Sequence, residues 1–488
     1  MNFRRARALA LGCLVACAHD AAAPSSAPPA AVLAAGAQPA QDTHAQAVTP
    51  AALPDAGAST AAATDAGAAP GNAAQTAATC AAVAPSFVEP VTFSTGVIKS
   101  AVPHVEGEAE QLRAFHEKLA RIARGSATEK VRIAFYGDSN MTRDFISGAF
   151  RRALQARFGD AGHGFVAAAR PWGWYEHMDV RHDVAPKEPW SIFAASGRQL
   201  GDKTYGFANI AAETSQGGAS TWVATALASG PSPVGKAASS AEVFYLKRPN
   251  GGTFNLMVDG AKMEEVSTAA ESVEPGYVRV KFADGPHKVE SVVKGGRGVR
   301  IFGTALERET AGVVVDSLGS GALNYELLAH VDSASRIAML KERNYDLVVF
   351  LLGTNTLAAE RKWVSAVLQD FRKGLPGAAL MLMSPPDQGV SHTDSTSNPA
   401  VARLASAMKE TAQIEHVLFW DFYEGMGGKG AIRAFVQTGL GEPDCVHLGF
   451  SGATLMGARF ASEMVRGFRS YLKANPAAGC LGPALAGP

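Results

Sequence analysis

Short apolar runs alternate with amphipathic segments along much of the chain. The first run, residues 131–136, stops at Gly137, and the segment after it has apolar residues at helical spacing. Four further runs, each with a flanking helical pattern, follow at residues 313–315, 347–352, 380–383 and 417–420. Buried-type strands that alternate with helices predict an α/β fold with a doubly wound, five-stranded parallel sheet. In such a sheet, functional loops follow the carboxyl ends of the strands.

The connection between the first two predicted strands is far longer than a crossover requires. A complete strand–helix–strand unit needs about 30 residues, yet the second strand begins only near Gly312. Between residues 179 and 308 the apolar positions alternate with a period of two, and turn sequences such as Asp259-Gly260 separate the runs. We therefore expect an antiparallel β-sandwich at 179–308, inserted into a sheet domain made of 86–178 and 309–475, with 476–488 as a C-terminal tail.

The first residues of the chain have the pattern of an export signal. Three arginines precede an apolar stretch that is too short to span a bilayer, which predicts a signal peptide over residues 1–16. The stretch ends in Leu14-Val15-Ala16-Cys17, which resembles a bacterial lipobox, where cleavage precedes a cysteine that then carries lipid. We expect acylation at Cys17. The alternative is an ordinary signal peptide that happens to contain a cysteine.

A segment of low complexity follows the predicted signal. Residues 17–85 are mostly Ala, Pro, Gly, Ser and Thr, with few large apolar side chains. Such a segment cannot bury enough apolar surface to offset its chain entropy, so we expect a disordered tether. No other apolar stretch reaches the roughly 18 residues of a membrane-spanning helix, and the lipid is the one membrane attachment that we expect. The predicted location is the bacterial cell envelope, at the outer membrane or facing the periplasm.

The charge balance and the cysteines limit the possible partners and bonds. The 488 residues include 45 Lys and Arg against 45 Asp and Glu. A neutral chain lacks the positive field that usually attracts phosphates, so nucleic acid is not an expected partner. Export would leave Cys80, Cys445 and Cys480 in an oxidising compartment. We hypothesise a disulfide between Cys445 and Cys480, with two unpaired thiols as the alternative.

A serine stands where the first strand turns into a helix. In Gly137-Asp138-Ser139 the hydroxyl would be exposed at the sheet edge, and the N–H of Ser139 would lie near a helix N-terminus. This is a suitable position for a nucleophile and for an oxyanion that develops beside it. The tripeptide alone is a weak signal, since it also occurs as a simple turn or cap.

A serine nucleophile needs a base, and an Asp-x-x-His pattern supplies an imidazole with an orienting carboxylate. Only one such pair lies in a loop after the fifth strand and just before a helix that opens near Ser451, where a doubly wound sheet brings its last loop over its first. That pair is Asp444 and His447. The chain contains four such pairs: Asp160/His163, Asp179/His182, Asp284/His287, which is typical of a hairpin turn, and Asp444/His447.

Donors for an oxyanion are expected at the ends of the second and third strands. The second strand leads into Gly319-Ser320-Gly321, and the third into Gly353-Thr354-Asn355. A glycine N–H can approach a substrate closely, and an asparagine amide offers a second donor. The alternative is that the glycines start helices and that Asn355 caps a helix beginning near Leu357.

The four motifs around these residues, in their order along the chain, resemble those of the SGNH/GDSL hydrolase family. The letters of the family name fall on Ser139, Gly321, Asn355 and His447. The resemblance covers residues 131–158 and 312–471. It implies a flavodoxin-like sheet, Ser139 as nucleophile, and His447 as general base oriented by Asp444. It also implies an oxyanion hole made by the N–H groups of Ser139 and Gly321 and the amide of Asn355. No metal or other cofactor is implied.

Two residues depart from the family pattern, and one glycine is ambiguous. Asn140 stands where the family usually has Leu, and Thr356 stands where it often has Asp. Gly319 is an alternative to Gly321. We choose Gly321 because it lies five residues after Asp316, as the family's glycine does after its usual Asn.

An inserted β-domain in an exported chain further resembles bacterial peptidoglycan O-acetylesterases and related carbohydrate acyl-esterases, with a carbohydrate-binding-like sandwich at this place. Trp172, Trp174 and Tyr175 could stack on a sugar ring, or they could pack the joint between the two domains.

We expect a lipoprotein serine esterase that removes acyl groups, in the first place acetyl, from a carbohydrate polymer such as peptidoglycan. The alternatives are an O-acyltransferase that uses the same residues and a non-catalytic glycan-binding surface protein.

Overall fold

The computed structural model describes residues 81–480, apart from residue 95, residues 187–188 and residues 358–359. The predicted signal peptide, Cys17 and nearly all of the predicted tether lie outside these residues. Within the described part of the chain, no helix combines the length and the apolar character needed to cross a membrane.

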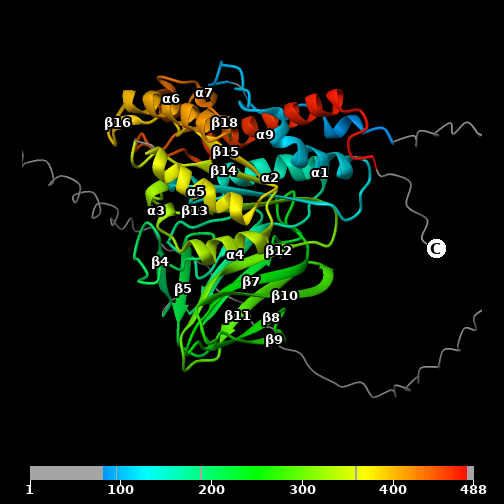
Figure 1. Ribbon diagram of the computed structural model, residues 1–488, viewed down its shortest axis with the longest axis vertical. Helices are drawn as coiled ribbons and strands as arrows, with labels where there is room; N and C mark the ends of the chain where they lie inside the picture. The colour runs from blue at the N-terminus through cyan, green and yellow to red at the C-terminus, as the bar shows by residue number, and fades with distance from the viewer. Residues whose placement is uncertain (1–80, 95, 187–188, 358–359, 481–488) are drawn as a thin grey trace, which may run out of the picture. The chain divides into compact units, whose positions relative to one another are not determined.

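A five-stranded, all-parallel sheet positions the loops that matter for function (Figure 1). Each of the five predicted strands is present, and the order of the strands is β13-β1-β14-β15-β18. Because β13 and β14 flank β1 on opposite sides, the chain reverses its winding direction at β1. The loops after these three strands therefore meet at one edge of the sheet. The strands are β1 (Lys130–Gly137), β13 (Gly312–Gly319), β14 (Leu347–Leu351), β15 (Ala379–Met383) and β18 (Leu418–Trp420).

Helices cover both faces of the parallel sheet. Successive side chains of β1 point to opposite faces: Phe135 packs against rings of α2 and α9, whereas Tyr136 packs against a ring of α5. Burial on both faces explains why β14 and β15 are apolar along their whole length. The helices are α1 (Arg113–Ala123), α2 (Phe145–Phe158), α3 (Tyr325–Ala329), α4 (Ser333–Arg343), α5 (Arg361–Gly374), α6 (Pro399–Ile414), α7 (Phe422–Met426), α8 (Ala431–Gln437) and α9 (Phe450–Ala474).

Between β1 and β13 the chain forms two antiparallel sheets. One has the order β10-β7-β12-β5-β4, with β2 also paired to β12, and the other has the order β3-β6-β11-β8-β9. Side chains of the two sheets share one hydrophobic core, where the ring of Tyr245 packs 5.4 Å from that of Phe254. The strands are β2 (Gly164–Ala167), β3 (Val180–Ala185), β4 (Ser191–Ala194), β5 (Ile210–Thr214), β6 (Ser220–Thr225), β7 (Ala238–Lys247), β8 (Thr253–Val258), β9 (Ala261–Ser267), β10 (Glu274–Gly285), β11 (Lys288–Val293) and β12 (Val299–Glu307).

The turns between these strands follow the sequence signals only in part. Asp259 and Gly260 have φ values of 51° and 84°, as a tight hairpin turn requires, and they join β8 to its partner β9. The expected hairpin at Asp284 to His287 is wrong, because β10 pairs with β7 whereas β11 pairs with β6 and β8. This turn passes from one sheet to the other. The same turn residues serve both kinds of connection, so the sequence alone did not distinguish them.

Three further short elements and a small hairpin complete the described residues: η1 (Pro85–Phe87), η2 (Ala109–Leu112), η3 (Ser139–Met141), and the strands β16 (Gly389–Ser391) and β17 (Asp394–Ser397). The predicted limits of the inserted domain stay a prediction. One strand that lies before the predicted limit at residue 179, β2, pairs with β12 of the six-stranded sheet.

The hypothesis of a Cys445–Cys480 disulfide is wrong. Cys445 is a buried free thiol, and Cys480 is disulfide-bonded to a different partner. The length of α9 explains this result, because Cys445 precedes the helix and Cys480 follows it. A helix of 25 residues is about 37 Å long, whereas the Cα atoms of a disulfide lie within about 7 Å of each other.

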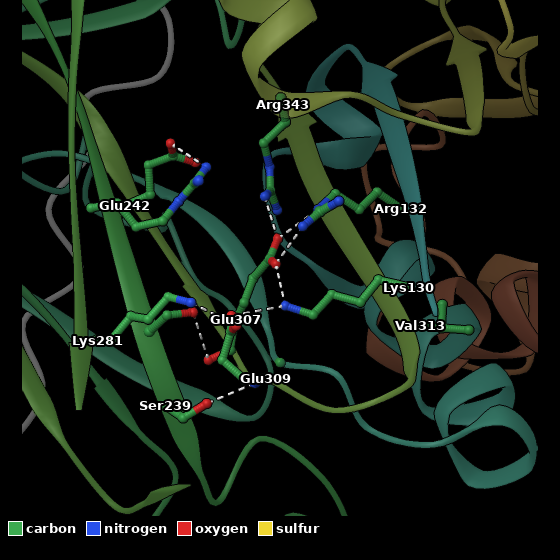
Figure 2. A network of polar contacts seen from close by, with 12 residues as sticks. Lys130, Arg132, Ser239, Glu242, Lys281, Glu307, Glu309, Val313 and Arg343 are labelled. Atoms are coloured by element: carbon green, nitrogen blue, oxygen red, sulfur yellow. Dashed lines mark hydrogen bonds and ion pairs between the residues drawn. The ribbon is translucent and has the colours of Figure 1, made fainter. Parts of the chain in front are cut away.

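Buried charges join the parallel sheet to the antiparallel strands (Figure 2). Glu307 of β12 accepts hydrogen bonds from Arg132 of β1 at 2.9 and 2.8 Å, and it also binds Lys130 and Arg343. Arg343, from α4, binds both carboxylate oxygens of Asp316 in β13 at 2.7 and 2.9 Å. Burial alone would raise the pKa of Glu307, but the three cations hold it well below its ordinary value. The acid is therefore ionised and holds three elements together.

We expect Glu307→Gln to reduce the free energy of unfolding by about 3 kcal/mol or more, because it leaves buried cations without a counter-charge. Urea unfolding measures the loss. Glu274→Gln is the matched control, since its ion pair with Lys247 is about half exposed, and its removal should cost less than about 1 kcal/mol. Equal losses for the two variants would contradict a structural role of the buried network.

Candidate active site

Three side chains from two distant parts of the sequence form a chain of hydrogen bonds at the carboxyl end of the parallel sheet. Nε2 of His447 lies 2.7 Å from Oγ of Ser139, and Nδ1 of the same ring lies 2.5 Å from Oδ2 of Asp444. The other oxygen of Asp444 accepts the backbone N–H groups of Val446 and His447, each at 3.0 Å. The carboxylate is thus fixed, and it holds the imidazole in the orientation that a Ser–His–Asp triad needs.

The charges of this group favour a basic imidazole. Burial opposes protonation of His447, but the hydrogen bond and the negative charge of Asp444 raise the pKa of His447 above its ordinary value, and Asp138 and Glu442 add to this effect. Burial would raise the pKa of Asp444, yet its bond to His447 and two backbone N–H groups hold it well below its ordinary value. Asp444 therefore stays ionised while the imidazole accepts a proton.

A buried carboxylate fixes the turn that carries Ser139. Oδ1 of Asp138 accepts the N–H of Asn140 at 3.2 Å, and Oδ2 accepts the N–H of Thr354 at 3.1 Å. Burial raises the pKa of Asp138, although these bonds and the charge of His447 act in the opposite direction. Asp138 thus ties the serine turn to the loop that follows β14. In the sequence, Asp138 is recognisable only as a part of the Gly-Asp-Ser motif, and this role was not predicted.

Asn140 connects the same turn to the loop of the base. Its Nδ2 donates to Oγ1 of Thr354 at 3.4 Å, and its Oδ1 accepts the N–H of Leu448 at 3.2 Å. A leucine, which the family pattern usually has here, could make neither bond. The sequence shows that Asn140 replaces the usual leucine. Its two hydrogen bonds could not be predicted, because a single sequence does not show which loops lie next to each other.

The two candidate glycines after β13 have different surroundings. A Cβ atom at Gly319 would lie 2.0 Å from the carbonyl oxygen of Met141, so this glycine is needed for close packing under the serine turn. A Cβ atom at Gly321 would meet only the methyl group of Thr142, at 3.9 Å. Gly321 therefore has open space beside the serine turn, so it stays the candidate for the second backbone donor.

Asn355 follows Thr354 directly and is exposed. It does not cap a helix, because α5 begins at Arg361 and Glu360 occupies its N-cap position. Thr354 is held by Asp138 and Asn140, so these two residues position the backbone next to Asn355.

The residues of the other three Asp-x-x-His pairs make structural contacts with different partners. None of their aspartates binds the histidine of its own pair in the described residues. Asp160 accepts the N–H groups of Gly162 and Gly235, Asp179 binds Arg152, and Asp284 binds Arg308; His163 contacts His177, His182 packs on Tyr175, and His287 contacts Asp259.

One group in the described part of the chain brings together the atoms of a possible metal site. Ligand atoms of Asp144, His163 and His177 lie within 4.8 Å of one another. However, Arg151 donates to Asp144 at 2.6 Å. Burial and the charge of Arg151 lower the pKa of both histidines. The guanidinium already supplies the positive charge that a metal ion would bring, so these donors do not fit a cation.

The predicted aromatic residues divide into two groups. Tyr175 is buried, accepts the N–H of Ala167 at 2.8 Å, and packs edge-on against Trp172 at 5.5 Å. Trp174 is 51% exposed. Packing is therefore the role of Tyr175, whereas Trp174 is available to a ligand.

Comparisons with known proteins bear on the fold. The structure matches a peptidoglycan O-acetylesterase with a TM-score of 0.61 and 21% identity, over 75% of this chain and 99% of that chain. Weaker matches include a family two carbohydrate esterase from Clostridium thermocellum in complex with cellohexaose, with a TM-score of 0.24 and 11% identity over 57% of this chain and 98% of that chain. Another is a lipase/acylhydrolase from Enterococcus faecalis, with a TM-score of 0.24 and 20% identity over 32% of this chain and 77% of that chain.

No family model and no curated protein sequence matches the chain. The first of the structural matches confirms the α/β architecture with a parallel sheet that the sequence motifs implied.

We expect a sulfonyl fluoride to label Ser139 at a rate that increases with pH, because only the neutral form of His447 can take the proton of the hydroxyl. Since the pKa of His447 is raised, the midpoint should lie above 6.5. Asp444→Asn should lower the midpoint and slow labelling by roughly 10²- to 10⁴-fold. Peptide mass spectrometry over a pH series measures the rate. A midpoint that is unchanged in Asp444→Asn would contradict this electrostatic coupling.

Proposed function

We propose that the protein is a serine esterase that removes short acyl groups, in the first place acetyl, from a carbohydrate polymer. The observation that carries the proposal is the chain of hydrogen bonds from Asp444 through His447 to Ser139. The likeness of the fold to a peptidoglycan O-acetylesterase supports it. Peptidoglycan is therefore the first substrate to test.

The geometry suggests an acyl-enzyme route. Ser139 attacks the ester carbonyl while Nε2 of His447 takes the hydroxyl proton. The charge that develops on the carbonyl oxygen would be stabilised by the N–H groups of Ser139 and Gly321 and by the amide of Asn355. The sugar leaves as its hydroxyl after His447 returns the proton. A water molecule, activated by the same imidazole, then releases the acid.

Hydrolysis fits the surroundings of the base better than acyl transfer does. The side chain of His447 is 33% exposed and that of Asp444 is 36% exposed, so water can reach the imidazole. A transferase would need to exclude water from an acyl-enzyme that waits for a second sugar. Ester hydrolysis is therefore the activity that we propose.

We further propose that the protein acts in the cell envelope, anchored by lipid on Cys17. The lipobox-like end of the apolar stretch supports the anchor, and the low-complexity composition of residues 17–85 supports a flexible tether. A flexible chain of that length spans tens of ångströms, on the order of 50 Å. We also propose that the antiparallel strands form a carbohydrate-binding-like domain that presents the polymer to Ser139.

We expect the chain from residue 18 onward, which carries no lipid, to release acetate from O-acetylated peptidoglycan or from an acetylated plant polysaccharide. Ser139→Ala should lower this release by roughly 10³-fold or more, because it removes the nucleophile. Enzymatic assay of free acetate measures the rate. Undiminished release by Ser139→Ala, or no release from either polymer while p-nitrophenyl acetate is cleaved, would contradict the proposed hydrolysis of these glycans.

We expect Asn355→Ala to lower kcat about 10²- to 10³-fold with little change in KM, since the amide acts on charge that develops only in the transition state. Its melting temperature should stay close to that of the unaltered protein. Gly319→Ala is the contrasting variant, because its Cβ would collide with Met141, and it should lower the melting temperature instead. Steady-state kinetics on p-nitrophenyl acetate and thermal unfolding separate the two. An unchanged kcat for Asn355→Ala would exclude its assigned role.

A further inference from the structure

A hollow of about 610 Å³ opens beside the turn that carries Ser139. Its charged lining comes from three arginines, Arg143, Arg170 and Arg181, and one acid, Glu176. Trp174 supplies an exposed aromatic face in the same hollow.

Side-chain contacts connect the hollow to the segments that carry Ser139 and His447. Arg143 lies four residues after Ser139, and its guanidinium stands 5.7 Å from the ring of Phe145. That ring packs edge-on, at 5.0 Å, against Phe450, which is exposed and follows His447 by three residues. A polymer whose ester group lies at Ser139 could therefore also reach the hollow.

The positive charge of the hollow is only partly neutralised by the protein. In the described part of the chain, none of the three arginines takes part in an ion pair; Arg170 and Arg181 donate only to the backbone carbonyls of Gly173 and Thr225, at 3.0 and 3.1 Å. Many other arginines of this neutral chain have a carboxylate partner, as Arg308 does in Asp284.

The other titratable groups of the lining do not cancel this charge. Burial lowers the pKa of His177, and it lowers the pKa of His182 to about 4, so both rings are neutral near pH 7. Three arginines and Glu176 leave a net charge of 3 − 1 = +2 on the lining. A ligand with negative charge would be attracted there.

The aromatic face and the position of Arg170 are both fixed by the fold. Trp174 packs against Trp172, with ring centroids 6.4 Å apart, while 51% of it remains exposed. Ala169 and Arg170 have φ values of 58° and 47°, a left-handed conformation that is unfavourable for residues with a Cβ atom. The N–H of Ala169 donates to Oγ1 of Thr221 at 2.9 Å, which helps to hold this segment in place.

We propose that this hollow is a subsite for a carboxylate-bearing residue of the glycan, and that the enzyme therefore prefers anionic polymers. The inference deepens the proposed function and rests on it. A planar guanidinium pairs with a planar carboxylate through two parallel hydrogen bonds, and the indole of Trp174 offers an apolar face for a sugar ring. The carboxylate could be part of a uronic acid or of the lactyl and peptide groups of peptidoglycan.

Binding to the Ser139→Ala protein, from residue 18 onward, tests the subsite without any turnover. The first ligand pair is an oligogalacturonate and its methyl ester, which share a backbone and differ in charge. The second pair is a peptidoglycan fragment with free carboxylates and the same fragment with amidated carboxylates. Isothermal titration calorimetry at low salt measures the four dissociation constants, and the pair with the larger difference identifies the source of the carboxylate.

We expect the free carboxylate of at least one pair to bind about tenfold tighter than its neutral form, since hydrogen bonds to charged groups contribute more than neutral ones. Arg170→Gln together with Arg181→Gln should remove most of that preference. Arg403→Gln, which changes an exposed arginine of α6 outside the hollow, should leave it unchanged. A second set of titrations at high salt should show a reduced preference in the protein that keeps both arginines.

Equal binding of charged and neutral forms in both pairs would overturn the proposal, and so would a preference that survives in the double variant. Acetate release by the unaltered protein is scored separately. If no polymer is hydrolysed but the charge preference follows the two arginines, the subsite stands and the esterase proposal fails. If acetate is released without any charge preference, the esterase proposal stands and the subsite is rejected.

Discussion

The buried carboxylate of Asp138 is the contact on which the geometry of the site depends. Its two oxygens accept backbone N–H groups from two loops, that of Asn140 after β1 and that of Thr354 after β14. A buried acceptor without donors would be costly, so the folded chain must bring both loops to it. Ser139 directly follows Asp138, and Asn355 directly follows Thr354. Asn140 extends the contact to Leu448, next to His447, and so the loops of three strands are held together.

The antiparallel strands impose a second constraint, because they interrupt the chain between β1 and its neighbour β13. Asp316 in β13 accepts the N–H of Phe165 in β2 at 2.9 Å, and Arg343 links Asp316 to Glu307 at the end of β12. The strand that leads to Gly321 is therefore fixed both by its parallel pairing with β1 and by charges shared with the inserted strands. These contacts explain how a long insertion between β1 and β13 is compatible with the parallel pairing of the two strands at the site.

The sequence was sufficient for features that depend on local patterns. Apolar runs identified the five parallel strands, and the period of two identified antiparallel strands between residues 179 and 308. The position of a loop in a doubly wound sheet separated Asp444/His447 from three similar pairs, and the structure places this pair next to Ser139. Features that depend on which loops or sheets meet were not predictable from one sequence. They include the carboxylate contact of Asp138, the pairing of β2, the turn between sheets at Asp284, and the free thiol of Cys445. The role of Cys17 and the location of the protein stay predictions.

The central claim is that Ser139 carries the acyl group during turnover. Acid quenching during the steady state, followed by mass spectrometry of the peptide that contains Ser139, tests it most directly. With p-nitrophenyl acetate as substrate, we expect a fraction of this peptide to be heavier by one acetyl group. Rapid turnover with an unmodified Ser139 peptide at every pH, or with the acetyl group on another residue, would contradict the account.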